Sequence, residues 1–240
     1  MKKFLLELLF PDGVECVLCD RLIDHQHPFL CRECLSQFDF ISGKSCDGCG
    51  KILPPMYDGA FCSECMAHDQ PYKRMIACVT YNDFAAEAVW KFKYHHKRYI
   101  GRMMGLCMAD LLKATYIEDV DILVPVPIHN SKETVKGYNH SAIVAKEMAK
   151  ICDKSCFEDL LVRTRATRPL KDLTRQERFK ELETTFRVKE GYEVLAPAGK
   201  RILLIDDIFT TGTTARACSE ALVEAGFTDI TVMTFATGLL

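Results

Sequence analysis

The chain has 240 residues, and its 48% hydrophobic content is ample for a packed core, which excludes a wholly disordered protein. The formal net charge of −2 provides no global basic field, so any nucleic-acid-binding site has to be local. The opening MKKFLLELLFPDG starts like a signal peptide, but Glu7 interrupts its apolar run and Pro11 and Asp12 end it. No segment approaches the roughly 20 apolar residues of a membrane-spanning helix. We expect a cytoplasmic protein that begins with a short amphipathic helix.

The first part of the chain is dominated by cysteine pairs. Four CxxC pairs form two sets of four: Cys16, Cys19, Cys31 and Cys34, then Cys46, Cys49, Cys62 and Cys65. Two CxxC turns complete a tetrahedron of thiolates around zinc with no open position, so the sequence predicts two structural zinc sites. Disulfides are disfavoured in a cytoplasmic chain, and a thioredoxin-like site needs one CxxC pair before a helix. The spacing leaves open whether each set binds its own ion or the sets interleave.

After about residue 70 the CxxC pairs stop and apolar runs alternate with amphipathic stretches. We therefore predict a zinc module at 1–72 and a second domain at 73–240. Strands are predicted at 75–81, 121–127, 160–164, 201–205 and 230–236, and helices at 83–94, 100–114, 139–152 and 213–225. The charged segment 165–185 shows no apolar face. Strands that alternate with helices predict βαβ units and an α/β fold with a parallel sheet.

The stretch ILLIDDIFTTGTTARA, residues 202–217, combines the features of a ligand site. A buried strand delivers Asp206 and Asp207 at its carboxyl end, where open α/β sheets bind ligands. Thr210, Thr211, Gly212, Thr213 and Thr214 follow, and they supply N–H groups and hydroxyls just before a helix N-terminus, which suits a phosphate. Carboxylates beside a phosphate cradle are explained by a phosphorylated sugar, because they accept hydrogen bonds from its hydroxyls.

Two other nucleotide-related motifs fit this stretch less well. A Walker A loop needs the spacing GxxxxGK[ST], and neither that spacing nor its lysine is present. A receiver domain also has paired aspartates after its first strand, but only 33 residues follow Asp207 here. A purely structural strand–turn–helix unit is the remaining alternative.

The same stretch resembles the phosphoribosyl pyrophosphate (PRPP) signature of type I phosphoribosyltransferases. VPVPIHNSKETVKGYNHS and RPLKDLTRQERFKELETTF resemble two further blocks of the ComF (ComFC) competence family. That family carries an N-terminal double zinc ribbon, so the resemblance spans nearly the whole chain. It implies an α/β fold with a parallel-sheet, type I phosphoribosyltransferase-like domain behind a small double zinc-ribbon module.

The resemblance also implies roles for individual residues. Asp206 and Asp207 would hold the ribose hydroxyls, directly or through Mg²⁺, and 210–214 would bind the 5′-phosphate. The loop at 124–127, with Val126 and Pro127, would approach the pyrophosphate. Segment 165–185 would be a mobile loop that closes over the ligand, and Arg178 matches the family there. Lys136 stands where the family has arginine, Leu170 where it has glutamine, and Glu181 where it has asparagine.

Two segments break the neutral charge average. Residues 90–102 hold five Lys/Arg and no acid among Trp90, Phe92, Tyr94 and Tyr99, and 163–180 hold seven Lys/Arg against two acids. Cations beside aromatics suit single-stranded nucleic acid, and the candidate contacts are Lys91, Lys93, Lys97, Arg98 and Arg175. The alternative for 90–102 is a helix end with core aromatics and solvated lysines. A loop that faces pyrophosphate is an equal alternative for 163–180.

Two hypotheses follow for the whole chain. In the first, it is a ComF-type competence protein that handles single-stranded DNA during transformation, with a helicase-like partner, at the cytoplasmic face of the uptake machinery. In the second, it is a working phosphoribosyltransferase that uses PRPP with Mg²⁺ and an unknown acceptor base. A weaker third reading is a regulator that senses the phosphoribosyl compound. The altered 165–185 block favours the first hypothesis.

Overall fold

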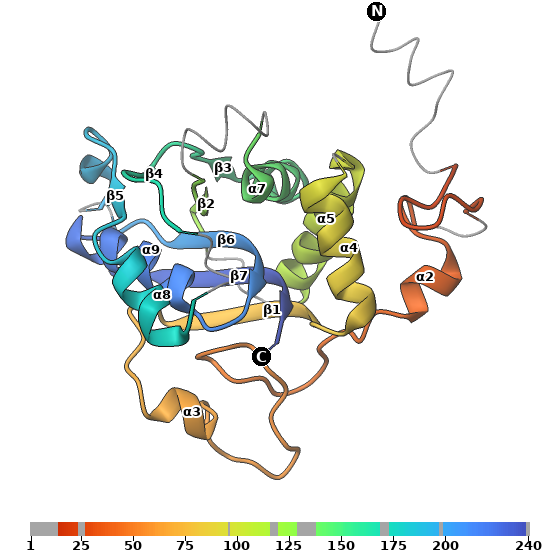
Figure 1. The fold of residues 1–240 in the computed structure, drawn as a ribbon, viewed down its shortest axis with the longest axis horizontal. Coiled ribbons are helices and arrows are strands. Elements are labelled where there is room, and N and C mark those ends of the chain that lie inside the picture. Colours follow the sequence, from red (N-terminus) through yellow and green to blue (C-terminus); the bar gives the residue numbers. More distant parts are fainter. Residues whose placement is uncertain are drawn as a thin grey trace, which may run out of the picture.

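The computed structural model describes residues 14–23, 27–95, 97–115, 120–128, 138–168, 173–196 and 199–238. A five-stranded sheet lies at its centre (Figure 1), in the order β1-β7-β6-β2-β3 with every neighbouring pair parallel. Its strands are β1 (Arg74–Thr80), β7 (Ile230–Thr237), β6 (Ile202–Phe209), β2 (Ile122–Pro125) and β3 (Ser155–Cys156). This arrangement confirms the predicted fold class, an α/β fold with a parallel sheet behind an N-terminal zinc-ribbon module.

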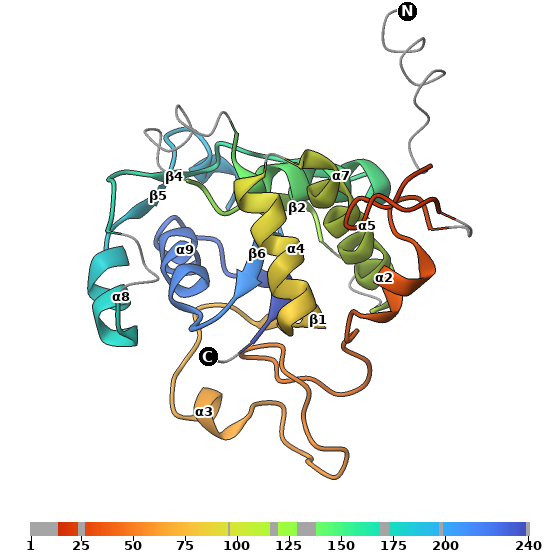
Figure 2. The same cartoon turned by 45° about the vertical axis from the view of Figure 1, so that its right-hand side comes forward.

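Helices cover both faces of the sheet. One face carries α4 (Asp83–Tyr94), α5 (Arg98–Ala114) and α7 (His140–Cys152), and the other carries α9 (Thr213–Glu224) with α8 (Arg175–Leu182) beside it. Because both faces are covered, the central strands are apolar on both sides, and Leu203 and Leu204 of β6 enter opposite buried clusters. Figure 2 shows α4 crossing in front of the sheet, beside α9 and α5.

Local sequence signals explain where these helices begin. The side chains of Asn82 and Asn139 cap α4 and α7, and Thr174 with Glu177 forms a capping box at α8. The structure confirms the predicted helix at 83–94, and it begins the helix predicted at 100–114 two residues earlier, at Arg98.

The cysteine-rich part of the chain wraps the outer edge of the sheet at β1. The short helices α2 (Arg32–Ser36) and α3 (Ser63–Met66) follow Cys31 and Cys62. In both views the segment with α2 lies beside α4 and α5, whereas the segment with α3 lies below the sheet (Figures 1 and 2). Residues of this part are buried in the same clusters as the sheet. The boundary at residue 72 stays a prediction.

Two strand predictions and the prediction for segment 165–185 need correction. The strand predicted at 201–205 continues to Phe209, so Asp206 and Asp207 lie within β6 rather than after it. The strand predicted at 160–164 forms as β4 (Leu161–Arg163), but it pairs with β5 (Phe186–Val188) in a separate antiparallel hairpin. Segment 165–185 was predicted to have no apolar face, but it does bury one side, because Leu182 at the end of α8 is 1% exposed. The 3₁₀ helix η2 (Glu193–Leu195) precedes β6. The predicted N-terminal helix lies outside the described residues.

Candidate functional site

The eight cysteines converge in two separate groups. Cys16, Cys19, Cys31 and Cys34 form one group, Cys46, Cys49, Cys62 and Cys65 form the other, and within each group all ligand atoms lie within 4.8 Å of one another. Zn–S bonds of about 2.3 Å in a tetrahedron place sulfurs about 3.8 Å apart. The Sγ–Sγ distances are 3.6 Å for Cys19–Cys31 and 3.9 Å for Cys49–Cys62, so both donor sets fit zinc. Each set is local, which settles the question that the spacing left open.

The first cysteine group is anchored to the α4–α5 side of the sheet. Phe38 packs edge-on against Phe84 and Phe235, with ring centroids 4.9 and 5.5 Å apart. Two lysines of the basic segment contact the same ribbon: Lys91 Nζ donates to Leu18 O at 3.0 Å, and Lys97 Nζ lies 3.4 Å from Asp20 Oδ1. These contacts pack the first cysteine group against α4 and the sheet, as expected of a structural zinc site.

The second cysteine group is anchored to the edge and the α9 side of the sheet. Met75 N–H of β1 donates to Asp47 O at 2.8 Å, and the Thr237 hydroxyl of β7 donates to Cys49 O at 2.7 Å. Arg216 of α9 donates to Asp69 O at 2.8 Å, which ties the chain after this ribbon to the helix. The second ribbon therefore reaches the carboxyl end of β6 and β7.

Asp206 and Asp207, near the end of β6, have different surroundings. Asp207 is buried and its Oδ1 accepts from Lys93 Nζ at 2.9 Å. Asp206 Oδ1 accepts from the Ser141 hydroxyl and from the Asp207 N–H, both at 2.9 Å. Burial, reinforced by the charge of Asp207, raises the pKa of Asp206 to about 7, although Lys93, the Asp207 N–H and Ser141 act in the opposite direction.

The loop after β6 has the geometry of an anion cradle. Gly212 is the N-cap of α9 with φ 74°, in the left-handed region, and a Cβ there would meet Phe209 Cζ at 2.6 Å. The hydroxyls of Thr211 and Thr213 lie 2.8 Å apart. The N-terminus of α9 also presents backbone N–H groups that lack partners within the helix. Glycine at 212 thus allows a close turn that points N–H groups and hydroxyls into one space.

Two adjoining cavities open at this loop. The smaller, about 240 Å³, is lined by all five loop residues together with Asp206, Arg178 and Thr234. The larger, about 670 Å³, shares Arg178 and 209–212 with the first and extends to the second ribbon, where Cys49, Cys65, His68 and Gln70 line it. The structure thus brings Asp206, Arg178 and the 210–214 loop together, whereas Asp207 turns toward α4.

The loop after β2 is linked to the acidic pair through α7. Val126 N–H donates to Ile205 O at 2.9 Å, and its carbonyl accepts from Asn139 Nδ2 at 3.0 Å. Asn139 caps α7, and Ser141 in its first turn reaches Asp206. Val126 and Pro127 are buried, and Lys136 lies outside the described residues. The contact of Ser141 with Asp206 joins residues far apart in the chain, and no local pattern in the sequence reveals it.

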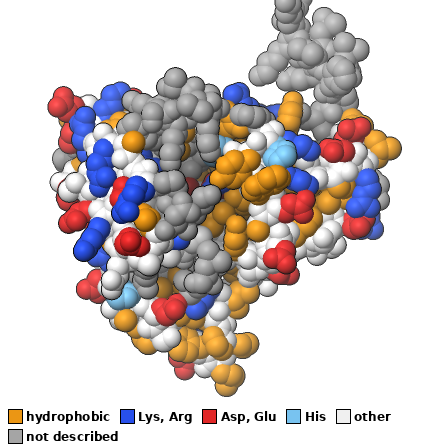
Figure 3. Space-filling view, viewed as in Figure 1, with side chains coloured by type: hydrophobic (Ala, Val, Ile, Leu, Met, Phe, Trp, Pro, Cys, Tyr) orange, Lys and Arg blue, Asp and Glu red, His pale blue; other side chains and the backbone are white. Residues whose placement is uncertain are grey.

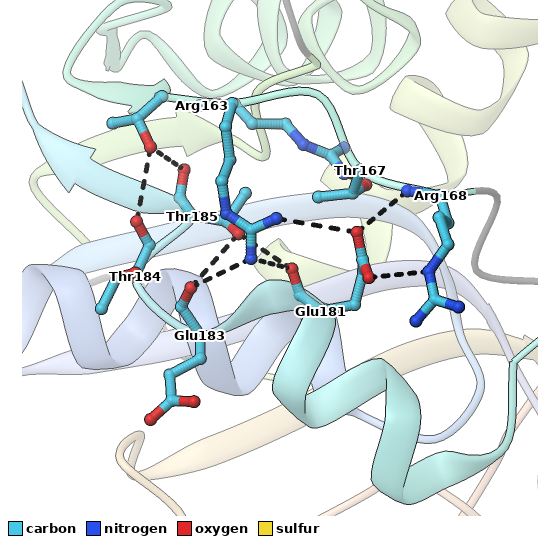
Figure 4. A network of polar contacts seen from close by, with 9 residues as sticks. Arg163, Thr167, Arg168, Glu181, Glu183, Thr184 and Thr185 are labelled. Carbon is cyan, nitrogen blue, oxygen red and sulfur yellow. Dashed lines mark hydrogen bonds and ion pairs between the residues drawn. The ribbon is translucent and has the colours of Figure 1, made fainter.

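The charged segment around α8 is held by an ion-pair network (Figure 4). Glu181 accepts from the N–H and Nε of Arg168, both at 3.0 Å, and Arg165 donates to the Glu181 carbonyl at 2.6 Å. The N–H and guanidinium of Arg168 hold the pKa of Glu181 below its usual range. The glutamate that departs from the family pattern therefore joins the start of the segment to the end of α8. Leu170 lies outside the described residues.

The predicted nucleic-acid contacts have other partners in this structure. Lys91 also pairs with Glu87 at 2.7 Å, Lys93 is paired with Asp207, and the Arg98 guanidinium lies 4.5 Å above the Tyr138 ring centroid. The side chain of Arg175 is outside the description. The neighbouring aromatics stay open to solvent, with Trp90, Tyr94 and Tyr99 between 52% and 59% exposed.

Comparison with known proteins completes the description. Residues 5–66 match the family described as "Double zinc ribbon domain". Competence protein F of Haemophilus influenzae is 22% identical over 90% of this chain and 94% of its own length. Competence protein ComFC of Bacillus subtilis is 25% identical over 88% of this chain and 89% of its own length. The resemblance to the ComF family is confirmed. DNA utilization protein YhgH of Escherichia coli K12 is 23% identical over 88% of this chain and 91% of its own length.

No helix among the described residues combines the length and the apolar character that crossing a membrane requires.

Proposed function

We propose that this protein binds phosphoribosyl pyrophosphate at the carboxyl end of β6. The 5′-phosphate lies in the 210–214 loop, the ribose hydroxyls donate to Asp206 and Asp207, and Mg²⁺ arrives with the pyrophosphate. Arg178 faces the same cavity and supplies a positive charge. Val126, Pro127 and Lys136 are the proposed contacts of the pyrophosphate, by the resemblance to the ComF family. The same proposal includes the division of the chain into a zinc module at 1–72 and a ligand-binding domain at 73–240.

One observation carries this proposal. A carboxylate and a left-handed glycine N-cap line the same cavity of about 240 Å³, at the end of a central parallel strand. The N-cap site favours an anion, and the carboxylate favours hydroxyl donors, so a ligand has to carry both groups. A phosphorylated sugar does so, whereas a free phosphate would meet the repulsion of Asp206 without any compensating hydrogen bond.

Calorimetry with PRPP and Mg²⁺ tests the site. The wild-type protein binds one molecule per chain, and Asp206→Asn with Asp207→Asn weakens binding at least about 100-fold, because two buried charge-assisted hydrogen bonds are lost. Circular dichroism and zinc content of the double variant match the wild type. Unchanged affinity in the folded double variant would refute the assignment of the two aspartates.

The biological role that we propose is the handling of single-stranded DNA during uptake. Two of the similar proteins are named as competence proteins and one as a DNA utilization protein. Trp90, Tyr94 and Tyr99 give α4 and α5 an exposed aromatic surface that can stack bases, and Figure 3 shows hydrophobic side chains gathered right of centre over α4. Because the nearby lysines are paired within the chain, stacking contributes more here than the lysine charges do. A helicase-like partner remains a prediction.

Fluorescence anisotropy with labelled single strands tests this role. We expect the affinity for single strands to fall by about tenfold or more between 50 and 200 mM salt. Trp90→Ala with Tyr94→Ala weakens binding roughly 10–100-fold, since each stacked base contributes about 1–3 kcal/mol. Phe40→Ala, which removes an exposed aromatic elsewhere, serves as the control. Binding that ignores both salt and the aromatic variants would contradict the proposal.

A second candidate function, an active phosphoribosyltransferase, is favoured by the larger cavity. It adjoins the phosphate loop and is lined by Gln70, Gln176, Phe179 and Arg216, which offer amide, aromatic and cationic groups to a second ligand. Pyrophosphate release from PRPP with Mg²⁺, measured across free bases and nucleic acids, separates the two functions. Release with a free base would establish the transferase, and binding of PRPP without release across the panel favours the DNA-handling role.

A further inference from the structure

Lys93 is placed at the acidic pair by the last turn of α4. Its ammonium lies 2.9 Å from Asp207 Oδ1, and the exposed fractions of the two side chains are 31% for Lys93 and 7% for Asp207. The preceding residue, Phe92, is fully buried against the sheet and fixes this end of the helix. Lys91, two residues earlier, is directed instead to Glu87 and Leu18. Helix α4 thus places Lys91 at the first cysteine group and Lys93 at the acidic pair.

The ammonium balances part of the charge at this site. Two carboxylates and one ammonium leave a net charge of −1 when all three are ionised. Burial acts to lower the pKa of Lys93, but the carboxylates of Asp207 and Asp206 outweigh it and raise that pKa, so the lysine is charged at neutral pH. Two other cations lie in this region: Arg98 stacks over Tyr138, and Arg178, which lines the cavity with Asp206, donates to Leu173 O at 3.0 Å.

The same contact limits what Asp207 can bind. Direct Mg²⁺ coordination needs an oxygen about 2.0–2.1 Å from the ion in near-octahedral geometry. Asp207 Oδ1 already accepts from the ammonium at 2.9 Å, so a directly bound dication would lie within a few ångströms of a positive charge. Like charges at that separation repel strongly in a partly buried site. The Lys93 side chain is 31% exposed, so an anionic ligand oxygen can approach it.

We propose that Lys93 is a positioning residue that serves as the resident cation of the acidic pair. It holds the Asp207 carboxylate in place, prevents that carboxylate from binding a divalent metal directly, and donates to an anionic oxygen of the bound ligand. Metal then enters only on the ligand's diphosphate. The last point rests on the proposed PRPP site, whereas the exclusion of metal from the ligand-free protein does not.

Mn²⁺ binding to the zinc-loaded full-length protein, measured by electron paramagnetic resonance without any PRPP, tests the exclusion. The wild-type protein shows no Mn²⁺ site that depends on the acidic pair. Lys93→Met gains one site at least ten times tighter than wild-type binding, and this gain disappears in Lys93→Met with Asp207→Asn. Lys93→Arg restores the cation and behaves as the wild type. Lys97→Met, which removes a lysine paired with Asp20, is the matched control.

Two results would overturn the inference. The first is a stoichiometric Mn²⁺ site in the wild-type protein that Asp207→Asn removes, and this measurement needs no lysine variant to fold. The second is a folded Lys93→Met variant that binds Mn²⁺ no better than the wild type. In a separate arm, Lys93→Met weakens PRPP binding about tenfold and Lys93→Arg restores it. Absence of PRPP binding in the wild type would refute the proposed function and leave the Mn²⁺ result valid.

Discussion

In the zinc-ribbon module, eight thiols converge in two groups of four, whereas at the end of β6 two adjacent carboxylates lie near one ammonium, which pairs with Asp207. The cysteines satisfy one another around a common centre, and the chain around them packs into the core of the sheet. At β6 the pKa of Asp206 is raised by burial, and Gly212 holds a left-handed turn against a phenyl ring. The cysteine module therefore stabilises the fold, whereas the end of β6 keeps a buried carboxylate and a strained turn whose cost a bound ligand can relieve.

The largest effect is expected from the cysteine groups. Cys46→Ser or Cys31→Ser removes a buried ligand, so zinc content falls from two ions per chain to one, and the unfolding free energy falls by more than about 4 kcal/mol. Metal analysis and urea denaturation measure both quantities. Cys107→Ser, which changes a cysteine outside the groups, keeps two ions. Two zinc ions in a folded Cys46→Ser variant would show that these thiols do not hold the metal.

A smaller loss is expected at the turn of the ligand site. Gly212→Ala places a Cβ in a left-handed conformation against Phe209, and we expect a cost of about 2–3 kcal/mol. Gly199→Ala is matched to it, because Gly199 has a φ of 64° and nothing within 4 Å of an added Cβ. Gly199→Ala therefore measures only the cost of holding an alanine in the left-handed conformation, about 1 kcal/mol. Equal losses in both variants would contradict the role of the Phe209 ring.

A gain of stability is expected at Asp206. Since its pKa is about 7 in the folded protein and near 4 when unfolded, the folded chain holds an extra proton between these values. The unfolding free energy of the wild type therefore falls as pH rises from 4 to 7. Asp206→Asn removes this dependence and stabilises the protein on the order of 1–2 kcal/mol at pH 8, with little effect at pH 4. Denaturation at the two pH values measures it.

Asp207→Asn is the control for that gain. We expect it to lower the unfolding free energy, because it removes the carboxylate that pairs with the Lys93 ammonium. Equal destabilisation by Asp206→Asn and Asp207→Asn at pH 8 would contradict the asymmetry of the pair.

The smallest effect on stability is expected from two variants that each remove a side chain in contact with one part of the zinc module. Arg216→Met removes the bond to Asp69 O and the ion pair with Glu220. Lys91→Met removes the bond to Leu18 O and the ion pair with Glu87, so each variant loses two exposed or partly exposed contacts. We expect both to cost less than about 1 kcal/mol. Because only Arg216 lines the larger cavity, only Arg216→Met weakens a ligand bound there, by a few-fold. Equal effects of the two variants on ligand affinity would contradict a special role for the second ribbon.

The sequence predicted those parts of the fold that local chemistry determines. The CxxC spacing identified all eight clustered cysteines, and apolar spacing gave α4 its bounds. The short strands β3 and β5 escaped detection, because two or three residues carry no measurable alternation. The end of β6 was misplaced because its last residues pair with β7 despite their charge, so a tertiary contact overrides the local pattern.

The candidate site was predictable only in part for a similar reason. Asp206, Asp207 and 210–214 are contiguous, so one motif carries them. Lys93 and Ser141 come from α4 and α7, and they meet the pair only when the sheet is assembled. In the sequence Lys93 belongs to a basic segment that favours nucleic acid, and only the structure shows its carboxylate partner.

The central claim is that β6 and the loop after it bind a phosphoribosyl ligand within a zinc-stabilised fold. A crystal structure of the protein soaked with PRPP and Mg²⁺ tests it most directly. The account predicts the 5′-phosphate in the loop at 210–214, the ribose against Asp206 and Asp207, and a tetrahedral metal in each cysteine group. PRPP bound away from this loop, or a loop without ligand at saturating concentration, would contradict it.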